Sequence, residues 1–574
     1  MKTRHFAAIL ALTTLITLLG AAPSWAQATA VGRQGMVASV DAYATAVGVE
    51  ILKRGGNAVD AAVAVSLALA VTHPQAGNLG GGGFLVIHLQ ERGFDTTVDY
   101  RERAPLAGGR DMYLDANGEV IPDASLYGYL AAGVPGQVAG LWLAHSRYGS
   151  LPWRELVEPA IRLARDGFEV NYWLADSFGY AAERLAAYPS TAKVFLKDGK
   201  PYAYGELFRQ PDLAWTLEQI AARGHDGFYK GEVARKIAAD MAANGGLITE
   251  EDLAGYEAVE RAPVTGEFRG YKIVGMGPPS SGGLLLIQML GLLEPYELAA
   301  LGHNSSRYVQ LLTEAEKLAY ADRAEHMGDA DFYPVPVAHL ISPDYIAARR
   351  KEINLYRATP SERISAGEAP AAEREETTHF SVVDGKGNAV ACTTTLNGGF
   401  GSHVVAEGTG VLLNNEMDDF SIKPGFPNMY GLLGSEANAI APGKRMLSSM
   451  TPTIVLEDGA VRLVVGSPGG STIPTTVLQV TLNVLVHGLP LQAAVAAPRF
   501  HHQWLPDRTY VEKRGWPEDV LEALGRMGHT VYVRQTLTGH KLMIGDVHAI
   551  YIEAESGLLL GASDPRHGGV AKGY

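Results

Sequence analysis

Cysteine is almost absent from this chain of 574 residues. Cys392 is the only one, so the chain cannot form an internal disulfide and offers no C-x-x-C pair for a zinc site. Basic residues are also outnumbered, with 48 Lys and Arg against 62 Asp and Glu and a net charge of -14. A general binder of nucleic acid needs a basic surface to neutralise phosphates. These shortages argue against a disulfide scaffold and against a nucleic-acid-binding protein.

Long apolar runs are scarce too, and the clearest one lies at the start of the chain. Lys2 and Arg4 precede an apolar stretch at residues 6–19, and residues 24–26 (Ser-Trp-Ala) offer a small-x-small cleavage site. The stretch is too short to be assigned as a membrane span. We therefore predict a signal peptide over residues 1–26 and export to the periplasm or the medium, with no membrane anchor on the mature chain.

Familiar cofactor and metal motifs are missing as well. The glycine-rich stretch 77–83 runs into a strand-like segment, where a dinucleotide loop requires a helix. Residues 277–283 lack the G-x-S-x-G spacing of a serine nucleophile elbow. Adjacent His501 and His502 would point to opposite faces of a strand, and the sequence contains no H-E-x-x-H. We expect no metal and no cofactor, and we interpret the two histidines as structural.

What is present is the composition of a globular protein, with 47% apolar and 19% charged residues. Residues 58–71 have a helical pattern that is apolar on all sides, which is typical of a buried helix. Spacing and flanking Gly or Asn residues predict helices at 44–53, 58–71, 138–147, 153–165, 213–223, 233–244, 284–293, 306–329 and 475–486. Strands are expected at 36–40, 84–88, 411–420 and 453–456, with a final strand that ends at the tail 561–566.

Two β-rich runs surround a Gly-Lys-Gly-Asn turn at residues 385–388, which predicts a hairpin. Period-two alternation places Thr377, His379 and Ser381 on one face of its first strand. A Thr-rich hairpin in an ordinary sheet is one interpretation. The other is that Thr377 becomes a chain terminus, because a free α-amine with a pKa of about 7.7–8.0 can serve as the general base for its own hydroxyl. The polar connector 364–376 before it is a place where a cut is tolerated.

Two further stretches have the chemistry of a substrate site. Residues 466–471 (Gly-Ser-Pro-Gly-Gly-Ser) lie between an apolar strand and a helix, so their backbone N–H groups are candidates for an oxyanion hole. An ordinary tight turn is the alternative. Arg101 follows a predicted strand, and a guanidinium matches a carboxylate with two parallel hydrogen bonds. A solvated or ion-paired arginine is the alternative there.

Taken together, these segments resemble the γ-glutamyltranspeptidase family, the glutathione hydrolases of the N-terminal-nucleophile hydrolase superfamily. The resemblance covers nearly the whole mature chain. It rests on NAVDAAVAV (57–65), THPQAGNLGGGGF (72–84), NGGLIT (244–249), TTHFSVVD (377–384), NNEMDDF (414–420), LSSM (447–450), GSPGG (466–470), PRFHHQWLPD (498–507) and GASDPR (561–566).

The resemblance implies an α+β fold, a four-layer αββα sandwich, made as one precursor that cuts itself. The implied cut separates Glu376 from Thr377 and leaves a large subunit, 27–376, and a small catalytic subunit, 377–574, that share one core. Thr377 would then attack the γ-amide of glutathione or another γ-glutamyl compound. The glutamyl group would pass to water or to an amino acid or peptide amine.

The resemblance also assigns roles to residues of this chain. The catalytic group is Thr377, Thr395, Gly469 and Gly470, with Thr395 orienting the Thr377 amine and the two glycines holding the oxyanion. The substrate-binding group is Arg101, Ser448 and Ser449 for the α-carboxylate, Asn397, Glu416 and Asp419 for the α-ammonium, and Tyr430 on a lid loop. Glu416 departs from bacterial relatives, which often carry Gln at this position.

Two alternatives remain open on the sequence alone. A cephalosporin acylase of the same fold takes glutaryl groups that lack the ammonium, and Asp419 argues against it because an unpaired buried acid costs binding. An exported, non-catalytic protein that binds amino acids or peptides would keep its chain uncut.

Overall fold

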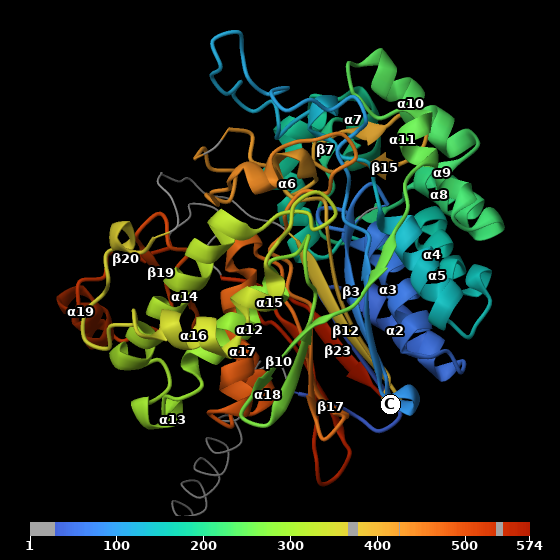
Figure 1. Ribbon diagram of the computed structural model, residues 1–574. Helices are drawn as coiled ribbons and strands as arrows, with labels where there is room; N and C mark the ends of the chain where they lie inside the picture. Colours follow the sequence, from blue (N-terminus) through green and yellow to red (C-terminus); the bar gives the residue numbers. More distant parts are fainter. Residues whose placement is uncertain (1–28, 78, 366–376, 424, 535–543) are drawn as a thin grey trace, which may run out of the picture.

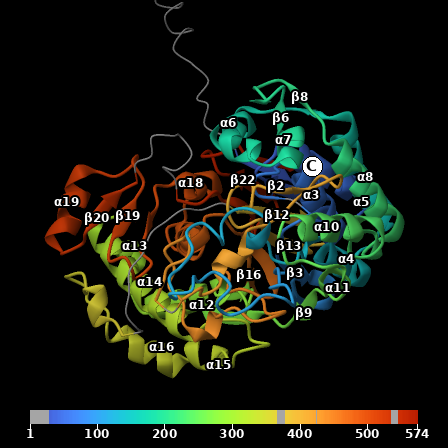
Figure 2. The ribbon, with the colours of Figure 1, turned by 90° about the horizontal axis from the view of Figure 1, so that it is seen from above.

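The structure is a computed structural model that describes residues 29–77, 79–365, 377–423, 425–534 and 544–574. Two seven-stranded sheets face each other in its centre, and helices cover the outer face of each (Figures 1 and 2). The predicted signal peptide and residues 366–376 of the predicted connector 364–376 lie outside the described residues. No helix in the described part of the chain is both long enough and apolar enough to cross a bilayer.

The first sheet contains the predicted hairpin. Its strand order is β23-β2-β12-β13-β3-β4-β9, and every neighbouring pair is antiparallel. Its strands are β2 (Gly35–Ser39), β3 (Gly82–Leu89), β4 (Phe94–Asp99), β9 (Val259–Arg261), β12 (Thr378–Asp384), β13 (Ala389–Thr395) and β23 (Val570–Gly573). The hairpin β12–β13 therefore occupies the middle of the sheet, between two strands from much earlier in the chain.

The second sheet packs against one face of the first. It runs β1-β22-β21-β17-β16-β11-β10, with strands β1 (Ala30–Gly32), β10 (Val264–Phe268), β11 (Tyr271–Gly275), β16 (Thr453–Glu457), β17 (Ala460–Val465), β21 (His548–Ile552) and β22 (Leu559–Ser563). Ser381 of β12 donates a 2.8 Å hydrogen bond to the carbonyl of His548 in β21. The face of the hairpin on which alternation predicted His379 and Ser381 thus points toward the second sheet.

Helices α2 (Ala42–Lys53), α3 (Ala58–Thr72), α4 (Gln137–Tyr148) and α5 (Trp153–Asp166) share a hydrophobic core with the outer face of the first sheet. Every residue of α3 is buried, which confirms the prediction from its all-apolar pattern, and Asn57 begins it with a capping box. Helices α12 (Gly282–Leu293), α14 (Ser306–His326), α17 (Ile473–Leu485) and α18 (Leu491–Ala496) cover the second sheet (Figure 1). The expected four-layer αββα sandwich is confirmed.

Smaller elements extend these layers. The remaining helices are α6 (Tyr172–Ala186), α7 (Pro189–Phe195), α8 (Pro211–Arg223), α9 (Asp226–Tyr229), α10 (Glu232–Ala243), α11 (Glu250–Ala254), α13 (Leu298–Leu301), α15 (Val337–Leu340), α16 (Pro343–Arg350) and α19 (Glu518–Arg526). The remaining strands are β5 (Phe168–Glu169), β6 (Leu196–Lys197), β7 (Lys200–Pro201), β8 (Leu207–Phe208), β14 (Val405–Ala406), β15 (Val411–Leu412), β18 (Phe500–His501), β19 (Thr509–Val511) and β20 (Val531–Val533).

Two sequence predictions about strands were wrong. The strand expected at 411–420 stops after Leu412. The Asn414 side-chain amide donates to the carbonyls of Gly80 and Gly133, and its oxygen accepts from the N–H of Glu416, so this side chain turns the backbone away from a strand. The chain then forms a short 3₁₀ turn, η4 (Glu416–Asp419). The tail 561–566 does not end the last strand, since β23 follows and pairs with β2 at the sheet edge.

Candidate active site

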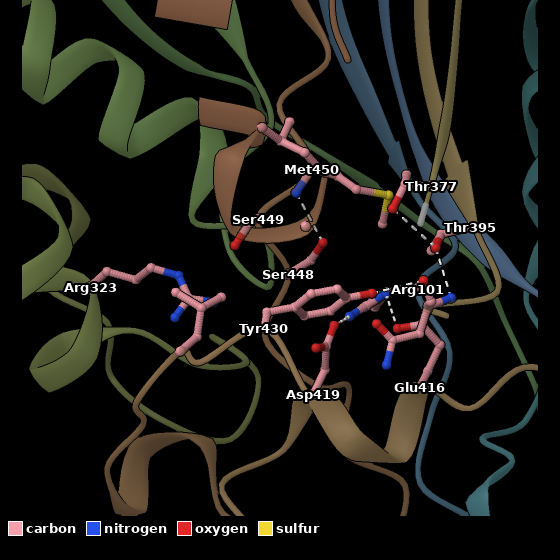
Figure 3. Close-up of a pocket in the computed structure, with 14 residues that line it drawn as sticks. Arg101, Arg323, Thr377, Thr395, Glu416, Asp419, Tyr430, Ser448, Ser449 and Met450 are labelled. Atoms are coloured by element: carbon pink, nitrogen blue, oxygen red, sulfur yellow. Dashed lines mark hydrogen bonds and ion pairs between the residues drawn. The ribbon is translucent and has the colours of Figure 1, made fainter. Parts of the chain in front are cut away.

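Thr377 lies directly before β12 and is 8% exposed. Its hydroxyl oxygen is 3.4 Å from that of Thr395, the last residue of β13, because the hairpin register places the two residues opposite each other (Figure 3). The Thr395 hydroxyl also accepts a 2.8 Å hydrogen bond from the backbone N–H of Asn397. The hairpin thus holds the candidate nucleophile and its predicted orienting residue side by side.

A glycine turn approaches the same point from the second sheet. Gly469 and Gly470 follow β17 with φ angles of 133° and 48°, a backbone region that favours glycine. The N–H and the hydroxyl of Thr472 both donate to the Gly469 carbonyl at 2.8 Å, which fixes the turn ahead of α17. Gly470 lines the cavity that contains Thr377. The turn therefore brings backbone N–H groups to the region of the Thr377 hydroxyl.

Arg101 is buried just beyond β4 and faces three carboxylates. Its Nη1 lies 2.5 Å from Glu416 Oε2 and 3.5 Å from Glu102 Oε2, and its Nη2 contacts Asp419. Two of the three acids of η4 thus reach the guanidinium, which also donates to the carbonyls of Met446 and Leu447. The sequence predicted Arg101, Glu416 and Asp419 but did not predict the contribution of Glu102.

The charges around Arg101 do not balance, and the pKa values of the acids reflect this. Burial is the main cause that raises the pKa of Glu102, to about 8, and Arg101 offsets only part of it. Burial likewise raises the pKa of Glu416 and of Asp419, again against the attraction of Arg101. Three closely spaced carboxylates around one buried guanidinium favour protonation of at least one of them. The site therefore has an excess of acid that suits a cationic group of a ligand.

Hydroxyl groups and a loop close the cavity. Ser448 accepts a 3.1 Å hydrogen bond from the N–H of Met450, while the buried hydroxyl of Ser449 has no hydrogen-bond partner among the described residues. Tyr430 donates to the Asn397 carbonyl at 2.7 Å, and Asn428 of the same loop donates to Asp419 at 2.8 Å. These bonds anchor the predicted lid loop over the charged groups.

The structure brings the predicted residues together with few exceptions. The cavity is lined by Arg101, Thr377, Thr395, Asn397, Glu416, Asp419, Tyr430, Ser448, Ser449 and Gly470. Gly469 adjoins Gly470, and Glu376 lies outside the described residues. The cavity also includes Arg323, Leu432, Met450 and Ile473, which the sequence analysis did not single out. No sequence signal marked Arg323, since it occurs in a helix that carries many other charges.

The two predicted structural histidines have local partners. His501 lies near Thr475 at 2.8 Å and Gln503 at 3.0 Å, and His502 lies 3.2 Å from Asp507. Among the residues that the structure describes, no group of three or more His, Cys, Asp or Glu side chains has the arrangement of a metal site.

Thr377 is buried at the start of a central strand, and its side chain lies between the two sheets of an αββα sandwich. This arrangement is typical of the N-terminal-nucleophile hydrolases. The comparisons with known proteins define the family within that class. A profile described as gamma-glutamyltranspeptidase matches residues 44–574. The chain belongs to the γ-glutamyltranspeptidase family, which confirms the resemblance seen in the sequence.

Individual relatives agree with this assignment. The chain is 51% identical to the glutathione hydrolase proenzyme of Escherichia coli K12, over 93% of this chain and 90% of that protein. A solved γ-glutamyltranspeptidase of Helicobacter pylori is 48% identical with a TM-score of 0.56, covering 57% of this chain and 94% of its own. A cephalosporin acylase of Bacillus halodurans superposes with a TM-score of 0.83 at 29% identity, covering 96% and 97% of the two chains.

Proposed function

We propose that the chain is a precursor that cuts itself between Glu376 and Thr377 into segments 27–376 and 377–574. The Thr377 hydroxyl attacks the carbonyl of residue 376, the backbone shifts from an amide to an ester, and water hydrolyses the ester. The new α-amine of Thr377 then serves as general base for its own hydroxyl, with a pKa of about 7.7–8.0 when unperturbed. Before the cut this nitrogen is an amide, so the chain has no base for turnover.

The mature enzyme cleaves the γ-glutamyl amide bond of glutathione and related compounds. The Thr377 oxygen adds to the γ-carbonyl, and its proton passes through the α-amine to the leaving nitrogen as the C–N bond breaks. Water or the amine of an amino acid or peptide then adds to the γ-glutamyl ester and restores Thr377. Thr395 orients the amine, and the N–H groups of Gly469 and Gly470 stabilise the oxyanion.

The charged groups bind the two ends of the amino-acid head. Arg101, with the hydroxyls of Ser448 and Ser449, receives the α-carboxylate, and Asn397, Glu416 and Asp419 receive the α-ammonium. Tyr430 closes the cavity and influences the choice between water and an amine. The single observation that carries this proposal is the contact of Arg101 with Glu416 and Asp419 in the cavity that also contains Thr377. Opposite charges in one small site suit a zwitterion.

The proposal extends to the subunit composition and the location of the enzyme. The two segments remain together as a heterodimer, act on small molecules without a cofactor, and are exported to the periplasm or the medium without a membrane anchor. Support comes from the proenzyme names of the relatives and from the signal-like residues 1–26.

The test compares γ-glutamyl-p-nitroanilide with glutaryl-p-nitroanilide, which differs only by lacking the α-ammonium. We expect a higher kcat/KM for the γ-glutamyl compound. Preference for the glutaryl compound would assign the site to a cephalosporin acylase, the activity named for the Bacillus halodurans protein. Binding without turnover by an uncut chain would assign it to a non-catalytic, exported binding protein for amino acids or peptides.

A further inference from the structure

A second buried guanidinium lines the cavity. Arg323 lies on α14, is 4% exposed, and extends toward the cavity from the side away from Thr377 (Figure 3). Its Nε donates a 3.1 Å hydrogen bond to the hydroxyl of Ser281. Within the described residues it forms no ion pair with any carboxylate, although Asp419 attracts it from a greater distance.

The two arginines of the cavity therefore differ in how far their charges are compensated. Arg101 already contacts Glu416 and Asp419 and lies near Glu102. Arg323 contacts no carboxylate in the part of the chain that the structure describes, and burial is the main cause that lowers its pKa, to about 10, so it remains charged at neutral pH. A buried charge without a counterion is costly unless a ligand supplies one. The missing partner of Arg323 is an anion.

A short hydrogen-bond chain connects Arg323 to the backbone carbonyl of Ser448, one of the two predicted substrate-binding serines. The Ser281 hydroxyl accepts from Arg323 and donates to the Ser448 carbonyl at 2.8 Å, and the Ser281 N–H donates to the same carbonyl at 2.8 Å. Ser281 belongs to the turn 277–283, whose sequence did not fit a nucleophile elbow. This turn instead fixes Arg323 relative to Ser448 and Ser449.

We propose that Arg323 is a second cationic anchor for the α-carboxylate of the γ-glutamyl substrate, with Ser281 as its positioning residue. The inference rests on the proposed function, because it adds a group to the same site. The buried Ser449 hydroxyl has no hydrogen-bond partner among the residues described, so an anion near Arg323 would also satisfy it. Arg101, held by two acids, orients the ammonium-binding carboxylates as much as it binds the substrate.

A competing role for Arg323 acts through Asp419. The positive charge of Arg323 lowers the pKa of Asp419 and so favours the ionised form that an ammonium needs. If this were its only role, losing Arg323 would weaken binding of the ammonium rather than of the carboxylate. Substrates that lack one group or the other separate the two roles.

The experiment combines Arg323→Met with three anilides. γ-Glutamyl-p-nitroanilide carries both groups, glutaryl-p-nitroanilide lacks the ammonium, and 4-aminobutyryl-p-nitroanilide lacks the carboxylate. We expect kcat/KM to fall about 10- to 100-fold for the γ-glutamyl and glutaryl compounds, mainly through a higher KM. A loss of this size is the usual cost of removing a charge-assisted hydrogen bond. For 4-aminobutyryl-p-nitroanilide the change should stay within about 3-fold. Competitive inhibition by glutarate and by 4-aminobutyrate gives the same comparison if a truncated anilide turns over too slowly.

Equal losses on all three compounds would overturn the proposal, and so would a loss confined to compounds that carry the ammonium.

Arg323→Lys keeps the charge for folding and self-cleavage, and we expect the same pattern at roughly 3- to 10-fold, since the planar fork is lost. Ser281→Ala should shift KM in the same direction. Arg349→Lys is the control, because Arg349 on α16 pairs with Asp322, the neighbour of Arg323 on α14, and is not among the residues that line the cavity. Wild-type enzyme that fails to cleave γ-glutamyl-p-nitroanilide would refute the proposed function instead.

Discussion

At the scale of single residues, the site depends on an excess of carboxylates around one arginine. Glu102 and Glu416 are buried beside Arg101 and Asp419 is partly buried there, and both oxygens of Glu102 lack a hydrogen-bond partner among the described residues. The family resemblance identified Glu416 and Asp419. It did not identify Glu102. A Glu that follows an Arg at the end of a strand is usually exposed to solvent, so nothing in the sequence placed it in the site. Only the closed packing around Gly82 and Arg101 makes it part of the site.

Asp419→Asn should selectively weaken binding of the α-ammonium. The substitution keeps the shape of the side chain but removes its charge, so kcat/KM for γ-glutamyl-p-nitroanilide should fall about 10- to 100-fold. The value for glutaryl-p-nitroanilide, which has no ammonium, should change little. Asp418→Asn is the matched control, since Asp418 accepts from Ser125 and from the Met429 N–H and anchors the loop. An Asp419 variant that loses both activities equally would contradict the assigned role.

Glu102 should make stability depend on pH. Its pKa is raised to about 8 from 4.5, so the folded state binds more protons than the unfolded state between these values. The contribution of Glu102 to stability is therefore fully present below pH 4.5 and is lost as the pH rises toward 8. The melting temperature should fall more between pH 5 and pH 8 for the wild type than for Glu102→Gln. If the melting temperature changes with pH in the same way for the wild type and for Glu102→Gln, this titration of Glu102 is excluded.

At the scale of secondary structure, sequence periodicity predicted the elements that depend on local pattern. The hairpin β12–β13 and the buried helices α3 and α12 occur where alternation or continuous apolar spacing placed them. The sequence did not predict η4 or β23. The first depends on Asn414 bonds to Gly80 and Gly133, and the second on pairing with β2, all of them distant in sequence. Arg323 escaped prediction for the same reason, because only the packing of α14 beside the turn 277–283 brings it to the cavity.

The turn after β17 should tolerate no side chain at Gly466. A Cβ atom there would lie 2.4 Å from two ring atoms of His379, which is held by Thr393 and Ser381. Either β12 or the glycine turn must shift, and we expect Gly466→Ala to cost about 1–3 kcal/mol in unfolding free energy. Turnover should also fall, because a misplaced oxyanion donor typically costs about 10²–10³ in kcat. Thermal unfolding and steady-state kinetics measure both effects.

Gly525→Ala provides the control for that substitution. Gly525 lies in helix α19, and a Cβ atom there would have open space around it, with no described residue outside the local helix within 4 Å. Alanine there should leave the activity unchanged and stabilise the helix by up to about 1 kcal/mol. A Gly466→Ala variant with the stability and activity of Gly525→Ala would contradict the predicted clash.

At the scale of the whole molecule, both sheets contain strands from before and after residue 377. The later strands β12 and β13 lie between the earlier strands β2 and β3, and β16 pairs with the earlier β11. Cutting the chain at 376 breaks one peptide bond and none of these ladders. The two segments cannot separate without dissolving both sheets and the core between them.

The cleaved protein should therefore behave as one particle until it is unfolded. Native size-exclusion chromatography should give a single peak that contains both segments, and denaturing electrophoresis should resolve it into two bands. Thr377→Ala should elute at the same position and give one band. Release of the smaller segment under native conditions would contradict the shared sheets.

The central claim is that Thr377 becomes the first residue of the catalytic segment. The most direct measurement is N-terminal sequencing of the smaller fragment from purified wild-type protein, with activity on γ-glutamyl-p-nitroanilide measured on the same sample. We expect the sequence to begin Thr-Thr-His-Phe, and Thr377→Ala to remain a single inactive chain. Turnover by a chain whose 376–377 bond is intact, or a fragment that starts at another residue, would contradict the account.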